Sequence, residues 1–227
     1  MLEINWIYLT IKLTISTNLF VLNYYSDHIA ANIITIDWEI IPLDLPTVSK
    51  KCSTCKNNEF ECSKKFRVNS NKKLSDVWLI YKCTNCNSTW NMTVISRKNL
   101  SKISSDLFDK YQQNNIDLIS QYAFDKGLLK KNKVIIIPPL IQTLGPDIKE
   151  IINYPNKYVG LNIKLQYPLN ISIKKILKEK LSITVRFLEE MLKQNIFIFP
   201  DNHNNTIFKV LINLENFRKY YYTSVEG

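Results

Sequence analysis

Two short stretches of the sequence each place two cysteines three positions apart. KCSTC contains Cys52 and Cys55, and KCTNC contains Cys83 and Cys86. Each Cys-x-x-Cys turn, or knuckle, directs two thiolates at one centre, and two knuckles close a tetrahedral four-sulfur site at Zn–S distances of about 2.3 Å. The paired spacing therefore predicts one metal site, with Zn2+ as the favoured ion and iron as the alternative that the ligand types leave open.

Disulfide bonding and redox catalysis fit these cysteines less well. A total of five cysteines in a chain with no sign of secretion argues against a disulfide framework, and a thioredoxin-type pair would need a single motif at a strand–helix junction. Four thiolates leave no coordination position for water, so we expect a structural metal and not a catalytic one. The fifth cysteine, Cys62, lies two positions from Phe60, and we expect both on the inner face of a strand, outside the metal site.

Three strand-like runs surround the knuckles. They cover residues 60–67, 77–81 and 89–94, and the turn-rich stretch NSNKKLSD separates the first from the second. The order knuckle, strand, loop, strand, knuckle, strand is that of a zinc ribbon, a small antiparallel sheet. A ribbon of about 45 residues is too small to be stable through its core alone. Metal binding, worth on the order of 10–16 kcal/mol in zinc peptides, would supply the missing stability.

The positive charge of the chain is concentrated around the cysteines. The formal net charge is +10, and residues 45–105 carry twelve lysine and arginine residues against three acidic residues, a balance of +9. A concentrated basic segment is typical of a protein that binds a polyanion. The alternative is compositional, because lysine outnumbers arginine 26 to 4, as an AT-rich genome would produce. That bias alone would not concentrate charge in one segment.

Basic and aromatic residues interleave along the predicted ribbon. Cations neutralise phosphates, and exposed aromatic rings stack on unpaired bases. We expect Trp78 and Trp90 to fill the ribbon core and the lysines of the loop to face a partner. The candidate nucleic-acid contacts are Lys64, Lys65, Arg67, Lys72 and Lys73 in the ribbon and Lys174, Lys175, Lys178 and Arg186 further along the chain.

The middle of the chain, residues 101–163, is predicted to be a helical segment with a packing role. Apolar residues recur there at helical spacing and predict two consecutive helices that are broken near Asn114, with Gly127 as a C-terminal cap. The run VIIIPP, residues 134–139, predicts a short buried segment that proline ends.

Two apolar stripes at helical spacing predict a pair of helices near the C-terminus. The stripes consist of Ile173, Ile176, Leu177 and Leu181, and of Val185, Leu188, Met191 and Leu192. We expect Ser182 or Thr184 to cap the second helix and Asn195 to take the left-handed conformation that ends it. A strand pair around the turn DNHNN is predicted to follow.

This arrangement resembles the alpha-L RNA-binding motif, a helix–helix–hairpin module of a ribosomal protein, pseudouridine synthases and tyrosyl-tRNA synthetases. The key positions of that motif fall on Ser172, Ile173 and Lys174 for its Arg-Leu-Asp, on Thr184 and Val185 for its Ser-Arg, and on Asn195 for its glycine. Arg186 lies one place after the missing arginine. The resemblance implies the module's fold and RNA binding, and an ordinary helical hairpin is the alternative.

The combination of features resembles an uncharacterised bacterial family, domain of unknown function 1062. The resemblance runs from about Trp38, in WEIIP, to the C-terminal strands and is sharpest through FRVNSNKKLSDVWLIYKCTNCNSTWNMTV. That family carries no assigned activity, so the resemblance implies a layout and no mechanism.

The first 36 residues lie outside that resemblance. Residues 7–16, IYLTIKLTIS, alternate apolar and polar side chains and predict a half-buried strand. They are too polar for a transmembrane helix, and they lack the basic start and the cleavage site of a signal peptide. We therefore expect a cytoplasmic protein with no membrane partner. A genuine extension and a mis-assigned start of translation are the alternatives for this segment.

Together these features predict an α+β protein in four parts. They are a doubtful extension (1–36), a zinc-ribbon domain (37–100), a helical segment (101–163) and an alpha-L-like helix–helix–hairpin module (164–227). The favoured function is non-catalytic RNA binding by a zinc protein, with structured or ribosomal RNA among the candidate partners. A zinc-stapled protein-interaction adaptor is the alternative. An enzyme ranks third, because the two histidines and four glycines form no evident catalytic group, phosphate-binding loop or small-molecule site.

The extension leads to a prediction about truncation. A chain that begins at Ile34 is expected to melt within a few degrees of the full-length chain, because residues 1–33 are predicted to add nothing to the core. Thermal unfolding of both chains, followed by circular dichroism, measures the difference. A shortened chain that fails to fold would show that IYLTIKLTIS belongs to the core.

Overall fold

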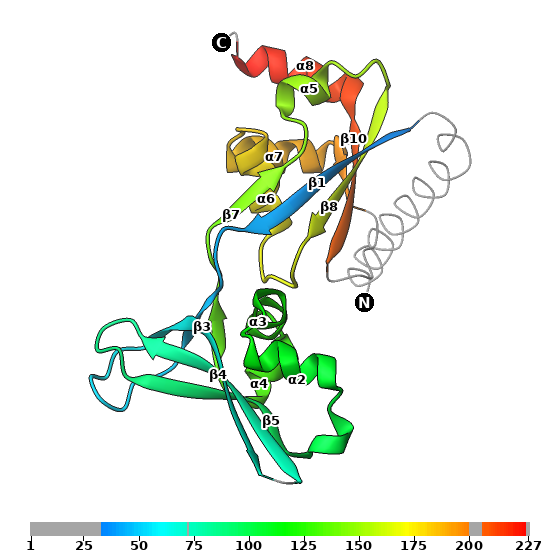
Figure 1. The fold of residues 1–227 in the computed structure, drawn as a ribbon. Helices are drawn as coiled ribbons and strands as arrows, with labels where there is room; N and C mark the ends of the chain where they lie inside the picture. The colour runs from blue at the N-terminus through cyan, green and yellow to red at the C-terminus, as the bar shows by residue number, and fades with distance from the viewer. Residues whose placement is uncertain (1–32, 72, 200–205, 226–227) are drawn as a thin grey trace, which may run out of the picture. The chain divides into compact units, whose positions relative to one another are not determined.

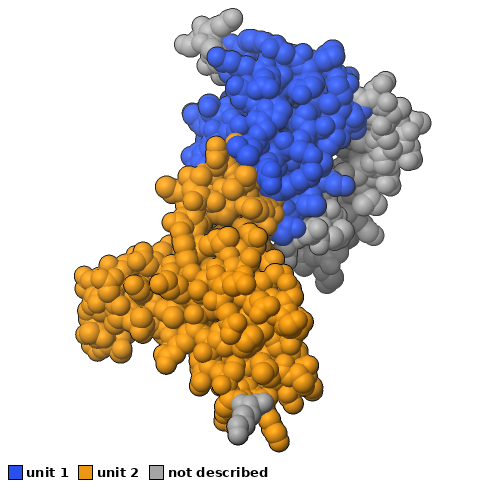
Figure 2. Space-filling model, in the orientation of Figure 1, with its two compact units in different colours: residues 1–39, 144–164, 172–227 blue, residues 40–143, 165–171 orange. Residues whose placement is uncertain are grey.

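Two five-stranded sheets organise the chain in a computed structural model, which describes residues 33–71, 73–199 and 206–225. The chain divides into two units (Figure 2). Unit 1 contains the described residues of 1–39, 144–164 and 172–227, and unit 2 contains those of 40–143 and 165–171. Seven α-helices accompany the sheets within the described residues, so the predicted α+β class is confirmed.

The sheet of unit 2, here called the cysteine sheet, is antiparallel. Its strands, in spatial order, are β5 (Thr89–Asn99), β4 (Leu74–Cys83), β3 (Glu59–Asn71), β2 (Thr47–Ser49) and β6 (Ile135–Ile137). The three strands predicted around the knuckles correspond to β3, β4 and β5 and are confirmed, each longer than expected. Along β4 the buried side chains alternate, with Val77, Leu79 and Tyr81 all fully buried. This period of two gives the sheet one core face.

Three helices cover that core face: α2 (Ser105–Gln112), α3 (Ile116–Ala123) and α4 (Lys126–Lys131) (Figure 1). Phe66 of β3 joins sheet and helices through edge contacts with the rings of Tyr111 at 5.0 Å and Tyr122 at 6.0 Å. The two tyrosine hydroxyl groups hydrogen-bond at 2.5 Å. Aromatic side chains whose polar ends are hydrogen-bonded to each other can be buried at little cost. The three rings therefore join the sheet to the helices within the core.

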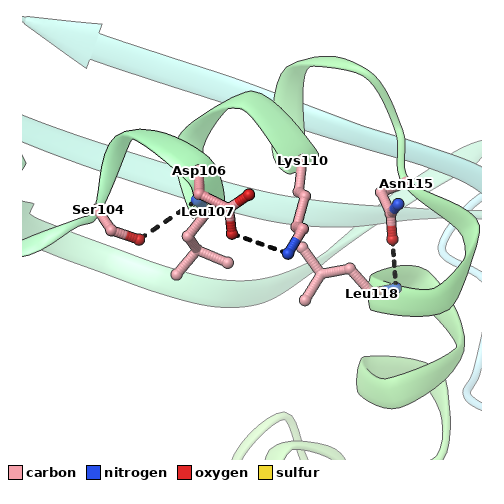
Figure 3. Close-up of polar contacts among 6 residues, drawn as sticks. All are labelled: Ser104, Asp106, Leu107, Lys110, Asn115 and Leu118. Atoms are coloured by element: carbon pink, nitrogen blue, oxygen red, sulfur yellow. Dashed lines mark hydrogen bonds and ion pairs between the residues drawn. The ribbon is translucent and has the colours of Figure 1, made fainter.

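Polar side chains begin and separate the helices. The Ser104 hydroxyl accepts the Leu107 N–H at 3.3 Å and the Asn115 side chain accepts the Leu118 N–H at 2.9 Å, so each satisfies a free donor of the first turn (Figure 3). The predicted break near Asn114 is confirmed. That residue is left-handed, with φ 53°, and its side chain accepts the Phe66 N–H at 2.6 Å.

Two predictions for the middle segment are wrong. Gly127 does not end a helix; it lies in the first turn of α4, which the Asp125 side chain caps by accepting the Leu128 N–H at 2.9 Å. The run VIIIPP is not a buried segment, because its central residues form the edge strand β6 and the Ile135 side chain is 73% exposed. Edge pairing to β2 satisfies its backbone on one side only.

The second sheet lies mostly in unit 1 and combines segments from distant parts of the chain. Its order is β7 (Ile141–Leu144), β1 (Ile34–Pro42), β8 (Tyr158–Leu165), β10 (Ile207–Asn213) and β9 (Phe197–Ile198). The division between the units falls within β1 and at the end of β7. Trp38 of β1 is fully buried and its indole N–H donates to the Pro146 carbonyl at 2.9 Å. Residues 34–36 are therefore part of a strand and not of an extension, while residues 7–16 lie outside the described residues.

Four helices accompany this sheet: α5 (Ile148–Ile152), α6 (Ile173–Lys180), α7 (Val185–Lys193) and α8 (Leu214–Val225). The helix α6 packs against α7, and α7 packs against β9. Most residues of the predicted apolar stripes are buried, but Val185 is 56% exposed at the first turn of α7. None of the helices formed by the described residues is long and apolar enough to cross a membrane.

The predicted ends of α7 are confirmed. The Thr184 hydroxyl accepts the Phe187 N–H at 3.1 Å, and Asn195 is left-handed with φ 52°. The predicted strand pair exists, with Leu211 opposite Ile198, but β10 makes its longer pairing with β8. Residues 200–205, which contain the turn DNHNN, lie outside the described residues.

The two units do not follow the linear parts expected from the sequence. Residues 101–137 of the predicted middle segment pack with the cysteine sheet in unit 2, whereas residues 144–163 supply α5 and most of β8 to unit 1. The reason is long-range strand pairing: β1 lies between β7 and β8. Pairings of this kind are not visible in local sequence patterns.

A glycine in unit 1 leads to a prediction about stability. Gly145 has φ +116°, and a Cβ atom there would lie 2.5 Å from the Asp37 carbonyl oxygen. Gly145→Ala is expected to lower the free energy of unfolding by at least about 1–3 kcal/mol. Alanine is strained at this φ, and its Cβ would also collide with the backbone of Asp37.

Gly160→Ala is the matched control in the same unit. Its Cβ would meet the end of the Thr35 side chain at 3.3 Å, which can move. We expect a change below about 1 kcal/mol in urea unfolding. Equal effects of the two substitutions would contradict the assigned role of Gly145.

Candidate metal centre

Two similar turns bring the four cysteines together. In the first knuckle the Cys52 N–H donates to the Asn57 carbonyl at 2.7 Å, and in the second the Cys83 N–H donates to the Ser88 carbonyl at 2.9 Å. The residue after the second cysteine of each knuckle is left-handed in both cases, with φ 65° at Lys56 and φ 59° at Asn87. The knuckles therefore share one backbone geometry, which points the paired thiols back at a common centre.

The four sulfur atoms converge as the spacing predicted. All lie within 4.8 Å of one another, with Cys52 Sγ 3.7 Å from Cys86 Sγ and Cys55 Sγ 3.5 Å from Cys83 Sγ. A tetrahedral site with Zn–S bonds of about 2.3 Å has its sulfur atoms about 3.8 Å apart. The cluster can therefore hold a metal ion such as zinc.

Polar groups outside the cluster stabilise negative charge on the sulfur atoms. The Ser88 hydroxyl lies 3.1 Å from both Cys52 Sγ and Cys86 Sγ. The Asn57 side-chain amide lies 3.7 Å from Cys83 Sγ and donates to the Thr84 hydroxyl at 2.8 Å. Such outer contacts orient the ligands and tune their basicity.

The surroundings shift the pKa of the Cys52, Cys83 and Cys55 thiols in different directions. Contact with the Ser88 hydroxyl and the backbone N–H of Cys55 lowers the pKa of the Cys52 thiol from 9.0 to about 5. The backbone N–H of Cys86 lowers the pKa of Cys83. At Cys55 a contact with Asn85 lowers the pKa, but burial and the neighbouring thiols Cys86 and Cys83 outweigh it and raise the pKa overall. One thiolate thus disfavours the next in the absence of a cation.

Cys62 lies outside the cluster, as predicted. It is partly buried on β3, opposite Tyr81, and burial raises the pKa of its thiol to about 11. The register shifts between Cys62 and Phe66, where Lys64 adopts φ 58°. Cys62 packs against the core cluster, as expected for the inner face of the strand, and the bulge lies between it and Phe66.

The predicted nucleic-acid contacts fall into both units. In unit 2 the side chains of Lys65, Arg67 and Lys73 are exposed, whereas Lys64 is paired with the Asp44 carboxylate at 3.3 Å. Lys72 lies outside the described residues. In unit 1 the residues are Lys174, Lys175, Lys178 and Arg186, on or beside helices α6 and α7, with Lys175 3.9 Å from Glu179. The two groups therefore belong to separate parts of the fold.

Three basic residues that the sequence reasoning did not single out gather at one end of the cysteine sheet. Lys98 lies opposite Ser75, the Leu100 N–H donates to the Lys73 carbonyl at 2.9 Å, and the region continues into Lys102. All the cations here are exposed, and we call Lys73, Arg97, Lys98 and Lys102 the basic tip. In the sequence, these residues were indicated only by the positive charge balance of residues 45–105 as a whole.

The aromatic residues of the cysteine sheet divide between its faces. Trp90 packs against the core, with its ring 6.2 Å from Phe60 and 5.4 Å from Tyr81, and Lys50 Nζ lies 4.9 Å from the same ring. Trp78 lies on the opposite face of β4, between the buried positions 77 and 79, and is only partly buried. The prediction that Trp78 fills the core is wrong, because residues 77–80 are all apolar and the alternation places the smaller Val77 inside.

Comparison with known proteins identifies the family of the chain. No curated protein matches the chain, and no solved structure matches it. The model of a family described as "Protein of unknown function (DUF1062)" matches residues 68–203, more than half of the chain. The match includes the second knuckle and the paired helices α6 and α7, so the resemblance seen in the sequence is confirmed over this range. The chain belongs to the DUF1062 family.

Proposed function

We propose that Cys52, Cys55, Cys83 and Cys86 hold one structural Zn2+ ion, so that the cysteine sheet and its knuckles form a zinc ribbon. The observation that carries the proposal is the sulfur geometry, with distances of 3.5 Å and 3.7 Å between paired atoms of different knuckles. Four thiolates complete a tetrahedral zinc site and leave no position for water. The metal therefore stabilises the fold and does not activate a substrate.

We further propose that the chain binds RNA without catalysis. The basic tip supports this proposal because it places several cations at one end of the cysteine sheet, and the exposed Lys65 and Arg67 add cations along β3. Residues 45–105 carry twelve cations against three acidic residues, and a surface of that kind attracts phosphates.

The C-terminal helices offer a second basic surface. The order α6, α7, β9, β10 is that of an alpha-L module, and Thr184 caps α7 at the position where that motif has serine. Lys174 and Arg186 are exposed, while Arg186 stands one place after the motif's arginine. These features favour contacts from unit 1 to RNA phosphates over sequence-specific contacts to bases, since lysine side chains bind phosphates without recognising the sequence.

We place this function in the cytoplasm. All five cysteines, which lie within the described residues, are free thiols. A reducing compartment keeps thiols available to a metal, whereas an oxidising one favours disulfides.

The zinc proposal predicts one zinc ion per purified chain. Cys86→Ser is expected to abolish stoichiometric zinc and to lower the melting temperature, because it removes a ligand from a site on which the small sheet depends. Elemental analysis and thermal unfolding measure the two effects. Cys62→Ser is the matched control and should retain the zinc, since Cys62 lies outside the cluster. Full zinc content in Cys86→Ser, or its complete loss in Cys62→Ser, would refute the ligand set.

The RNA proposal predicts a steep dependence of affinity on salt. For single strands the slope of log affinity against log salt is about −0.7 per phosphate neutralised. Changing Lys65, Lys73, Arg97 and Lys98 together to glutamine should flatten the slope by about two to three units if all four make contact. Changing Lys174, Lys175 and Arg186 together should weaken binding separately. Fluorescence anisotropy with a labelled RNA across a salt series measures both.

A quadruple glutamine variant of Lys126, Lys130, Lys131 and Lys133 is the matched control. It removes the same formal charge from unit 2 at α4 and just beyond it. If this control loses as much RNA affinity as the first variant, the loss reflects the net charge of the protein and not contacts made by those four residues. Affinity that is indifferent to salt and to both sets of substitutions would favour the adaptor hypothesis.

A further inference from the structure

The face of the cysteine sheet opposite its core carries an unusual cross-strand row. The register places Arg67 of β3 opposite Trp78 of β4, and Trp78 opposite Thr93 of β5. The helices α2 and α3 reach β3 from the other side, where Phe66 contacts Tyr111 and Tyr122. A large aromatic side chain thus stands between two polar neighbours, away from the core.

We infer that Trp78 is a stacking platform for an unpaired base of single-stranded RNA, with Lys65, Arg67 and Lys82 contacting the adjoining phosphates. This inference rests on the proposed RNA binding and adds to it a specific surface and a preference for single strands. Base stacking on an aromatic ring is independent of base identity and is combined with cations that follow the backbone.

The charges around Trp78 suit such a ligand. Phe66 points into the core, so the alternation of β3 places Arg67 on the Trp78 face, and Lys82 follows along β4. Lys65 is exposed in the bulge that precedes Phe66. Three acidic residues share this face. Glu59 and Glu61 lie at the start of β3, with Glu61 opposite Lys82, and the Asp76 carboxylate accepts the Arg97 N–H at 2.7 Å. The direct cross-strand neighbours of Trp78 carry no acid, and the acid two positions before it on β4 is engaged with the backbone.

The surface is extended in the direction of the strands. Leu74 and Lys82 each lie four residues from Trp78 along β4, or about 13 Å at the rise of a strand. Lys73 of the basic tip precedes Leu74, so cations flank the indole along the strand at both ends. An extended single strand can place a base on the ring and phosphates on both sides of it.

Trp90 provides the contrast within the same sheet. Its ring packs against the core and already has Lys50 Nζ at 4.9 Å. Trp78, in contrast, is not among the residues that form the core cluster of the described chain or pack against it. An apolar peptide is the less suitable occupant of the Trp78 face, because the direct neighbours of Trp78 are an arginine and a threonine.

Binding of a single-stranded oligouridine and of an RNA duplex with the same number of phosphates tests the inference. Trp78→Leu should weaken binding of the single strand by about 5- to 150-fold, the range that loss of one stacked base produces, and should leave duplex binding within two-fold. Ile80→Ala, on the same face of β4, is the matched control and should change neither affinity. Circular dichroism and zinc content establish that each variant is folded.

Indole fluorescence gives a second readout that does not depend on affinity. Oligouridine should quench the fluorescence of the full-length protein and of Trp90→Phe, and the quenching should be lost in Trp78→Phe, which retains a smaller ring for binding. Quenching that survives in Trp78→Phe, or equal losses for single strand and duplex in Trp78→Leu, would overturn the stacking role while leaving charge-driven RNA binding intact. Absence of binding to either RNA would overturn the proposed function itself.

Discussion

The convergence of four cysteine sulfur atoms on one point is the constraint on which unit 2 depends. Paired atoms from different knuckles lie 3.5 Å and 3.7 Å apart, a separation at which two thiolates repel each other strongly. The metal ion that we propose at the centre would replace this repulsion by attraction and connect the start of β3 to the end of β4. The long hairpin that these strands form then extends from a fixed base.

The two faces of the β3–β4 hairpin have different roles, because one packs in the core and the other is on the surface. One face buries Val77, Leu79 and Tyr81 beneath the helices, through the ring contacts of Phe66. The other face carries Trp78 among polar and basic neighbours. Because side chains alternate along a strand, each residue that enters the core commits its neighbour to the opposite face. The core and the proposed RNA surface are thus two sides of the same three strands.

The structure also changes which cations are available. Lys64 is held by Asp44, and Lys175 lies near Glu179, so these two contribute less free charge than the sequence suggests. Arg97 and Lys98, in contrast, join Lys73 at the basic tip because the β4–β5 pairing brings the end of β5 to the start of β4. The basic character of the segment around the cysteines remains, and the basic tip adds to it a group of exposed cations at one end of the sheet.

Local sequence determined the features that depend on neighbours along the chain. The spacing of the cysteines identified the cluster, strand alternation identified β3 to β5, and Asn114, Thr184 and Asn195 mark helix boundaries by their side-chain and backbone preferences. Tertiary structure alone decided the position of Trp78, since an unbroken apolar run does not say which alternate side chains are buried. It also decided the placement of β1 between β7 and β8, because strand pairing across the chain depends on contacts that no local pattern contains.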